Sequence, residues 1–301
     1  MKIIITWATW FIGRHVLSHF DNWENTIYAF WRNKLECTSP DIVDNLWDIR
    51  FPLEVTLPTS NIDVFIHIAG DTDYTRKQSD ILETNVHSMR NILDVADRYM
   101  VKHFIYISSS SVYQWISWHI WEEYPIQREN LTNSYALSKY LAEQKLFKEL
   151  NPKIKLSILR PRAVYGKWDH LLLPTILYHS FMKRLIMFWD GDIQTSLTHV
   201  ENLCEAISVV LENQTENRCI FNVADRDTMK LNDVYTSIWL KHKKVGVISL
   251  PIMLLGFLEY INKNKFSYIK DVFNKEKVLD ISKIQNLGYD WCYSFNSFIN
   301  R

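Results

Sequence analysis

The chain has 301 residues, of which 47% are hydrophobic and 23% charged, and its 34 basic residues equal its 34 acidic ones. This composition is typical of a globular protein, and the balanced charge provides no field that would attract nucleic acid. The four cysteines are scattered without metal-ligand spacing, which indicates reduced thiols in the cytoplasm. Met1 leads directly into an apolar run, and residues 247–258, the longest apolar run, are too few for a membrane span, so we expect no signal peptide and no membrane span.

The first twenty residues predict a strand, a tight turn and a helix. Residues 2–6 form an apolar run long enough for one buried strand, and apolar residues recur at helical spacing from Phe11 onward. This order is typical of a dinucleotide-binding βαβ unit, whose turn needs glycine where the backbone bends and where it approaches the pyrophosphate. Gly13 stands at the third glycine position, but Trp7 and Trp10 occupy the first two.

Strands and helices alternate along the rest of the chain. Strands are predicted over 26–30, 61–68, 103–108, 154–160 and 219–223, and helices over 80–99, 133–150, 171–182, 201–211, 231–242 and 251–261. The alternation predicts an α/β fold with a doubly wound, parallel, Rossmann-type sheet. Because the pattern becomes less regular after residue 166, we expect an NAD(P)-binding domain over 1–166 and a smaller substrate-binding lobe over 167–301. The strand over 219–223 is expected to return to the sheet.

The residues after the second strand bear on the choice of cofactor. In dinucleotide-binding folds an acidic residue there favours NAD, whereas a basic residue accommodates the 2′-phosphate of NADP. Arg32 and Lys34 occur there and no acid does, which favours NADP over NAD. The alternative is an ordinary solvated turn.

Tyr135 and Lys139 are the candidates for acid–base chemistry. They are four residues apart at the start of a predicted helix, so both side chains project from one face. A tyrosine that exchanges a proton near neutral pH needs a pKa well below its usual ~10, and a nearby ammonium group lowers it. Such a pair alone is often an ordinary surface feature, but this one follows a strand that ends in the serine-rich stretch 108–111.

With glycine in place of Trp7 and Trp10, the opening Thr-Trp-Ala-Thr-Trp-Phe-Ile-Gly resembles the fingerprint of the extended short-chain dehydrogenase/reductases, also called the NAD-dependent epimerase/dehydratase superfamily. The resemblance covers nearly the whole chain. It implies hydride transfer at a C–OH or C=O carbon of a small-molecule substrate, with Tyr135 as the acid/base. Lys139 would tune Tyr135, Ser109 would hold the substrate oxygen, and a homodimer is expected.

The same resemblance implies a set of cofactor contacts and no metal site. Asp48 and Ile49 match a segment that lies near the adenine amine, Ala69 matches small residues that the cofactor passes, and Asn85 matches a conserved helix position of the family. His67 is interpreted as structural. The expected cofactor-binding residues are Trp7, Trp10, Phe11, Ile12, Gly13, Arg32, Asp48, Ile49, Ala69, Asn85, Tyr135, Lys139 and Pro161.

Two segments bear on the branch of the superfamily. Nucleotide-sugar epimerases usually carry an Asn within the segment that is 160–164 here, and an Arg shortly before the His-Val pair at 199–200. This chain has Ala163 and Thr195 at those places. The segments look more like the 3β-hydroxysteroid dehydrogenase-like branch, which does not establish a steroid substrate. A nucleotide-sugar epimerase or dehydratase is the alternative.

Twelve tryptophans against seven glycines make the composition abnormal, since glycine averages about 7% of residues. Tryptophan stands at four family glycine positions (Trp7, Trp10, Trp47 and Trp168) and in seven turn-like stretches (Trp23, Trp31, Trp115, Trp118, Trp121, Trp189 and Trp291), whereas Trp239 lies in a predicted helix. One explanation is a pseudoenzyme that lacks the cofactor and acts as a binding or regulatory protein. The other is that UGA codons for glycine have been read as tryptophan. We favour the second, because decay would scatter replacements over many residue types and would not spare Tyr135 and Lys139.

Overall fold

The fold is built on one large parallel sheet. A computed structural model describes the chain except residues 23, 33–41, 74–75, 170–171, 173–179, 182–183, 189–192, 242–245, 252–259, 261–274 and 301. The sheet has seven strands in the spatial order β13-β7-β5-β4-β1-β2-β3, and every neighbouring pair is parallel. The strands are β1 (Lys2–Thr6), β2 (Thr26–Trp31), β3 (Ile42–Leu46), β4 (Val64–His67), β5 (His103–Ile107), β7 (Lys155–Pro161) and β13 (Arg218–Val223). The predicted α/β fold of Rossmann type is therefore confirmed.

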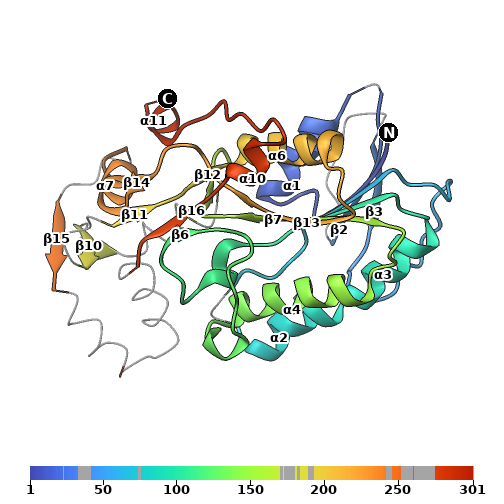
Figure 1. Ribbon diagram of the computed structural model, residues 1–301, viewed down its shortest axis with the longest axis horizontal. Helices are drawn as coiled ribbons and strands as arrows, with labels where there is room; N and C mark the ends of the chain where they lie inside the picture. The colour runs from blue at the N-terminus through green and yellow to red at the C-terminus, as the bar shows by residue number, and fades with distance from the viewer. Residues whose placement is uncertain are drawn as a thin grey trace.

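Helices cover both faces of this sheet (Figure 1). Successive side chains of a strand point to opposite faces, so Ile3 and Ile5 join one hydrophobic core and Ile4 joins the other. Over one face lie α1 (Phe11–Phe20), α6 (Val200–Asn213) and α10 (Ser282–Gln285); over the other lie α2 (Gln78–Leu82), α3 (Met89–Arg98) and α4 (Ser134–Glu149). Strand order reverses between β1 and β4, which is where open sheets of this class bind ligands.

The helix expected over 80–99 is not continuous. It is divided into α2, a π-helical turn over Glu83–His87 (η1), and α3. Within this region the hydroxyl of Ser88 donates to the carbonyl oxygen of Thr84. Such local π-helical turns often occur at functional sites, and this one carries Asn85.

Three other sequence expectations differ from the structure or cannot be compared with it. The strand β3 was not predicted, because Ile42–Leu46 contains two polar residues in five and lacks a clear alternation. The helices expected over 171–182 and 251–261 lie mostly outside the described residues, although the described pair Ser180–Phe181 is a strand, β9. Trp31 was placed in turn-like surroundings, but it is the buried last residue of β2.

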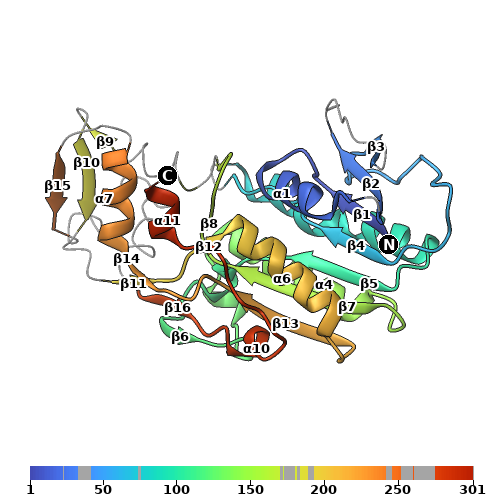
Figure 2. The ribbon, with the colours of Figure 1, turned by 90° about the horizontal axis from the view of Figure 1, so that it is seen from above.

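The later part of the chain forms smaller sheets at one end of the molecule (Figure 2). The first has the order β15-β10-β9, the second has the order β14-β11-β16-β6, and the third pairs β12 with β8. Two helices, α7 (Leu231–Lys241) and α11 (Phe295–Ile299), contribute to their core. The strands are β6 (Trp118–Ile120), β8 (Val164–Tyr165), β10 (Arg184–Phe188), β11 (Gln194–Thr195), β12 (Thr198–His199), β14 (Met229–Lys230), β15 (Val247–Leu250) and β16 (Lys277–Leu279).

The two parts of the chain exchange segments. The strand β13 follows residue 166 but extends the large sheet by pairing with β7, and α6 covers a face of that sheet. Conversely, β6 precedes residue 166 but pairs with β16. In the part of the chain that the structure describes, no helix is both long enough and apolar enough to cross a membrane.

Candidate active site

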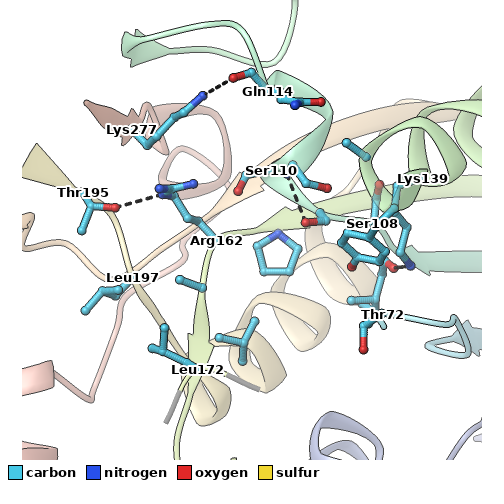
Figure 3. Close-up of a pocket in the computed structure, with 18 of the residues that line it drawn as sticks. Thr72, Ser108, Ser110, Gln114, Lys139, Arg162, Leu172, Thr195, Leu197 and Lys277 are labelled. Carbon is cyan, nitrogen blue, oxygen red and sulfur yellow. Dashed lines mark hydrogen bonds between the residues drawn. The ribbon is translucent and has the colours of Figure 1, made fainter. Parts of the chain in front are cut away.

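A cavity of about 310 Å³ lies at the carboxyl ends of the central strands (Figure 3). Its walls come from the segments that follow β4, β5 and β7, from α4, and from the later part of the chain. Ser109, Tyr135 and Lys139 all line it, as do Ile12 and Pro161. The structure thus brings the three predicted catalytic side chains to one cavity.

Lys139 is buried beside this cavity. Its Nζ donates a hydrogen bond of 2.8 Å to the carbonyl oxygen of Ile107, and it lies 4.7 Å from the ring centroid of Tyr106 and 5.9 Å from that of Tyr135. Burial lowers the pKa of Lys139 from its usual value to about 7, although the negative charge of Glu143 opposes this shift. Lys139 therefore changes its charge near neutral pH.

The position of Tyr135 is set by the start of α4. The side chain of Asn133 caps the helix by accepting hydrogen bonds from the backbone N–H groups of Tyr135 and Ala136, at 2.9 and 3.1 Å. The hydroxyl of Ser138 donates to the carbonyl oxygen of Tyr135 at 2.8 Å. These bonds hold the first turn of α4, so that residues 135 and 139 share one face towards the cavity.

The serine-rich stretch forms a turn directly after β5. Ser109 precedes a short 3₁₀ helix, Ser110–Tyr113 (η2), and its hydroxyl accepts a hydrogen bond of 3.1 Å from the backbone N–H of Ser111. The hydroxyl of Ser108 donates to the Glu143 carboxylate at 2.5 Å. All four serines, 108–111, line the cavity, and Ser109 is the one whose register matches the resemblance.

A buried ion pair joins these elements. Arg160 of β7 and Glu143 of α4 are both almost fully buried, and their guanidinium and carboxylate form hydrogen bonds of 2.6 and 3.0 Å. The same carboxylate accepts the Ser108 hydroxyl, and Arg160 also donates to the Tyr113 hydroxyl at 2.6 Å. Because a buried pair of this kind is costly to break, it fixes α4 relative to the serine turn and β7.

Asn85 connects the π-helical turn to the site. Its Oδ1 accepts from the backbone N–H of Asp71 at 2.6 Å, and its Nδ2 donates to the Ser138 hydroxyl at 2.8 Å. A Cβ added to Gly70 would lie 3.2 Å from Lys139 Nζ and 3.4 Å from Asn85 Oδ1. Asn85 therefore lies beside the buried lysine.

The end of β4 carries the small residues and the histidine noted in the sequence. The backbone N–H of Ala69 donates to the hydroxyl of Thr6, which also bonds His67 Nδ1 at 2.9 Å. Burial, with the nearby positive charge of Lys139, lowers the pKa of His67 to about 3, so the ring is neutral at physiological pH. His67 does not line the cavity among the described residues, consistent with its structural interpretation.

The turn between β1 and α1 has the backbone of a glycine turn. A Cβ at Gly13 would lie 2.0 Å from the carbonyl oxygen of Trp7, so α1 packs on the turn at a distance that only glycine allows. Trp7 itself has φ of 56°, a left-handed conformation that is unfavourable for a bulky residue. Its ring lies 5.8 Å from that of Trp10, whose side chain is about half exposed. The backbone of this turn is thus that of a glycine turn, but it carries two indole side chains.

The remaining predicted cofactor residues lie around this turn. Phe11 and Ile12 begin α1, and the guanidinium carbon of Arg32 lies 5.3 Å from the ring centroid of Trp7. Asp48 is paired with Arg50, and this hydrogen bonding lowers the pKa of the Asp48 carboxyl. Ile49 is buried. Lys34 lies outside the described residues.

Left-handed backbone also occurs at other tryptophans. Non-glycine residues with positive φ in the described chain are Trp7, Met100, Trp118, Ala163 and Trp168, so three of five are tryptophan. The side chains of Trp118 and Trp168 are at least half exposed. Trp23 and Trp189 lie outside the residues that the structure describes. Exposed indoles on left-handed backbone are typical of positions that require glycine.

The buried tryptophans have different surroundings. Trp31 and Trp239 are both enclosed, and the indole N–H of Trp31 has no hydrogen-bond partner among the described residues. Trp47 is enclosed as well, but its indole N–H donates to the carbonyl oxygen of Phe51 at 2.9 Å. Leaving a buried N–H without a partner costs about 1–3 kcal/mol, so Trp31 occupies an unfavourable site.

Sequence reasoning missed part of the cavity wall. Arg162, Gln114 and Lys277 line the cavity, and Thr195, noted only for lacking an arginine, also lines it. Arg162 could have been found from its place directly after Pro161. The position of Lys277 could not, because more than a hundred residues separate it from the 113–116 carbonyl oxygens that it binds.

Comparisons with known proteins identify the family and relatives of the chain. The sequence profile of the "NAD dependent epimerase/dehydratase family" matches residues 3–224. The chain is 22% identical to N-acetyl-alpha-D-glucosaminyl-diphospho-ditrans,octacis-undecaprenol 4-epimerase of Escherichia coli O157:H7, over 100% of this chain and 93% of that protein. It is also 22% identical to 2-alkyl-3-oxoalkanoate reductase of Stenotrophomonas maltophilia, over 70% of this chain and 66% of that one. The structure of UDP-glucuronic acid 4-epimerase from Bacillus cereus in complex with NAD superposes with a TM-score of 0.75 at 19% identity, covering 99% of this chain and 96% of that chain.

Proposed function

The chain belongs to the NAD dependent epimerase/dehydratase family, and from this premise we propose that it transfers hydride at a C–OH or C=O carbon of a small-molecule substrate, with Ser109, Tyr135 and Lys139 as its catalytic residues. One observation carries the assignment of the residues. The three side chains line one cavity, and the lysine among them is buried with a pKa near neutrality. Perturbed lysines of this kind in a cavity are typical of functional sites.

The roles follow from the chemistry of each side chain. In the oxidation direction Tyr135 accepts the proton of the substrate hydroxyl, while the carbon loses its hydrogen with two electrons. A nicotinamide bound beside the cavity would supply the acceptor for that hydride. The ammonium of Lys139 stabilises the tyrosinate, and the Ser109 hydroxyl donates to the substrate oxygen. In the reduction direction Tyr135 returns the proton to the alkoxide.

We propose that the dinucleotide is held by the turn at Trp7, Trp10 and Gly13 and by the other residues expected from the sequence. NAD dependence follows from the family. NADP is the finer proposal, supported by Arg32, whose guanidinium lies 5.3 Å from the ring of Trp7 at the edge of the turn. Replacing Arg32 with Gln should weaken the binding of NADPH by about 10-fold or more and leave that of NADH nearly unchanged. Equal losses for the two cofactors would contradict the preference.

The tryptophans at glycine positions are proposed to be glycines of the natural protein. The left-handed backbone of Trp7, Trp118 and Trp168 supports this, because it is the conformation that glycine adopts without cost. The coding DNA decides the matter: UGA at these codons supports the proposal, and UGG at Trp7, Trp10, Trp47 and Trp168 contradicts it. UGG would favour the pseudoenzyme.

A nucleotide-sugar 4-epimerase is the second candidate. It is supported by the full-length similarity to the undecaprenyl-diphosphate-sugar epimerase. Ala163 and Thr195, at the places where such enzymes usually carry Asn and Arg, favour an oxidoreductase instead. Epimerisation leaves the cofactor unchanged at the end of each turnover, whereas net oxidation or reduction changes the absorbance of the nicotinamide in proportion to the substrate.

The enzyme assignment is tested with purified protein in which Trp7 and Trp10 are glycine. It should bind NADPH or NADH, detected by cofactor fluorescence. With a panel of oxo acids and nucleotide sugars it should then transfer hydride, and Tyr135→Phe should lower the rate by about 10²–10⁴-fold without loss of cofactor binding. If this protein binds neither cofactor, the assignment is wrong.

The domain division, the location and the oligomeric state are also proposals. We propose that 1–166 mainly binds the cofactor and 167–301 mainly binds the substrate. A cytoplasmic location is supported by the free thiols of Cys204, Cys219 and Cys292. The proposal of a homodimer rests on the family resemblance, and light scattering during gel filtration would test it.

A further inference from the structure

We propose that the substrate is an organic acid with an aliphatic body, and that Arg162 binds its carboxylate while the reacting carbon lies at Tyr135. This inference deepens the proposed function and rests on it. Its starting point is the charge of the cavity wall. Among the described residues that line the cavity, the charged ones are Lys139, Arg162 and Lys277, and none is Asp or Glu.

Arg162 is held in place on the side of the cavity formed by the later part of the chain. Its Nε donates a hydrogen bond of 3.0 Å to the hydroxyl of Thr195, and its backbone N–H donates to the hydroxyl of Thr198 at 3.1 Å. Figure 3 shows the Arg162 side chain between Thr195 and the serine turn, with Lys139 on the far side of that turn. A guanidinium carries five N–H donors in a rigid fork that suits bidentate binding of a carboxylate.

Lys277 adds positive charge to the same region. It is buried, and its Nζ donates to the carbonyl oxygens of Tyr113, Gln114 and Ile116 at 3.0, 2.7 and 2.8 Å. The ammonium thereby holds the end of the serine turn in place. Because charges interact strongly where water is excluded, Lys277 also favours an anion in the cavity.

Among the described residues, one part of the wall is aliphatic and includes Leu172, Leu197, Leu231 and Val234. Polar side chains such as Gln114 and Asn133 line the cavity as well, so it is this aliphatic part that favours an alkyl chain, which needs only apolar contact. The volume of about 310 Å³ lies at the lower end of the range for ligand pockets. The combination of a fixed guanidinium, an aliphatic wall and Tyr135 at the other side fits a hydroxy or oxo acid better than a nucleotide sugar.

The test compares an acid with its neutral ester. The full chain is titrated calorimetrically with 3-hydroxyhexanoate, with methyl 3-hydroxyhexanoate and with UDP. The three affinities separate the contributions of a carboxylate, an alkyl chain and a diphosphate to binding. We expect the acid to bind more tightly than the ester. Arg162→Gln should weaken acid binding about 10–150-fold, the equivalent of losing charged hydrogen bonds, and leave ester binding unchanged.

Three further variants make the result specific. Arg162→Lys should recover part of the acid affinity because it keeps the charge. Thr195→Val should cause a smaller loss than Arg162→Gln, because it removes only the bond that holds Nε. Arg128→Gln removes one positive charge from the exposed 3₁₀ helix Arg128–Asn130 (η3) and should bind the acid as the unaltered chain does.

The proposal is overturned if acid and ester bind equally, if Arg162→Gln keeps full acid affinity, or if none of the three probes binds. Arg162-dependent binding of UDP without binding of the acid would also overturn it and would assign the guanidinium to a nucleotide sugar. Binding of NADPH is measured separately by fluorescence. Failure of cofactor binding with retained acid binding would therefore reject the proposed function and not this subsite.

Discussion

At the scale of single residues, the proposed site contains a lysine, Lys139, whose charged form is disfavoured by burial. Lys139 is enclosed, and its pKa of about 7 lies well below that of a lysine in water. The same burial that makes this ammonium costly to keep charged lets it act strongly on Tyr135, because little water screens it. The helix that carries both residues is held by Asn133 and by the Arg160–Glu143 ion pair.

Lys139→Met should lower the hydride-transfer rate about 10²–10⁴-fold and change the pH dependence of stability. Between pH 7 and about 10 the unfolded lysine binds a proton that the folded lysine does not, so the unaltered chain should gain stability as pH rises, relative to the variant. Below pH 7 the difference should be flat. Thermal unfolding across this range measures it, and Lys145→Met, in the Lys145–Glu149 pair at the surface of α4, is the control. A parallel pH dependence in both chains would contradict the depressed pKa.

Replacing Trp7 and Trp10 with glycine should restore cofactor binding. Glycine at 7 removes the left-handed strain, worth about 1–2 kcal/mol, and both changes remove the indoles from the turn. We expect tighter NADPH binding and a higher melting temperature, measured by fluorescence and by thermal unfolding. Trp115→Gly is the matched control, because Trp115 is exposed but does not have positive φ. Unchanged cofactor affinity in the double variant would contradict the role of these positions.

At the scale of elements, the cofactor turn depends on the close packing of α1 against the end of β1. Gly13 lies in the first turn of α1 and faces the backbone of Trp7 and Ala8. The contact is between backbone atoms, so neither side can yield by a change of rotamer. The π-helical turn with Asn85 and the serine turn with Ser109 are other short segments whose backbone positions residues of the proposed site.

Gly13→Ala should therefore be severe. The added Cβ would lie 2.0 Å from a carbonyl oxygen, and α1 would have to move away from the turn. We expect a loss of about 3 kcal/mol or more in the free energy of unfolding and no detectable cofactor binding. Ser18→Ala, an exposed position of the same helix, should change stability by less than about 0.5 kcal/mol. Urea unfolding compares the two, and similar stabilities would show that the helix can shift freely.

At the scale of the whole molecule, the large sheet and the smaller sheets are not sequential units. The strand β13 pairs with β7 and the helix α6 covers a face of the large sheet, although both follow residue 166. The strand β6 precedes residue 166 but pairs with β16. The cavity is lined by residues from both parts of the chain, including Lys277 of β16. Arg162 and Thr195 therefore lie in the same cavity wall as Tyr135 of α4.

A fragment of residues 1–166 should not fold by itself. Without the later residues, β7 loses its neighbour β13, and the face that α6 covers is left exposed. We expect the fragment to aggregate or to lack a cooperative thermal transition in circular dichroism, whereas the full chain should unfold in one main transition. A soluble fragment that unfolds cooperatively and binds NADPH would contradict this and would favour two independent domains.

Elements with local signals could be predicted from the sequence. Apolar runs predicted β1, β2, β4, β5 and β7, the spacing of Tyr135 and Lys139 predicted one helical face, and Gly13 marked the turn. Tertiary structure decided what depends on contacts between distant segments. These include the break of the helix over 80–99, the short strand β3, the enclosed position of Trp31 and the cation-lined wall formed with Arg162 and Lys277. The physical reason is that the periodicity of a segment shows which of its sides is buried. The segment that buries this side, and the charged residues of that second segment, come from elsewhere in the chain.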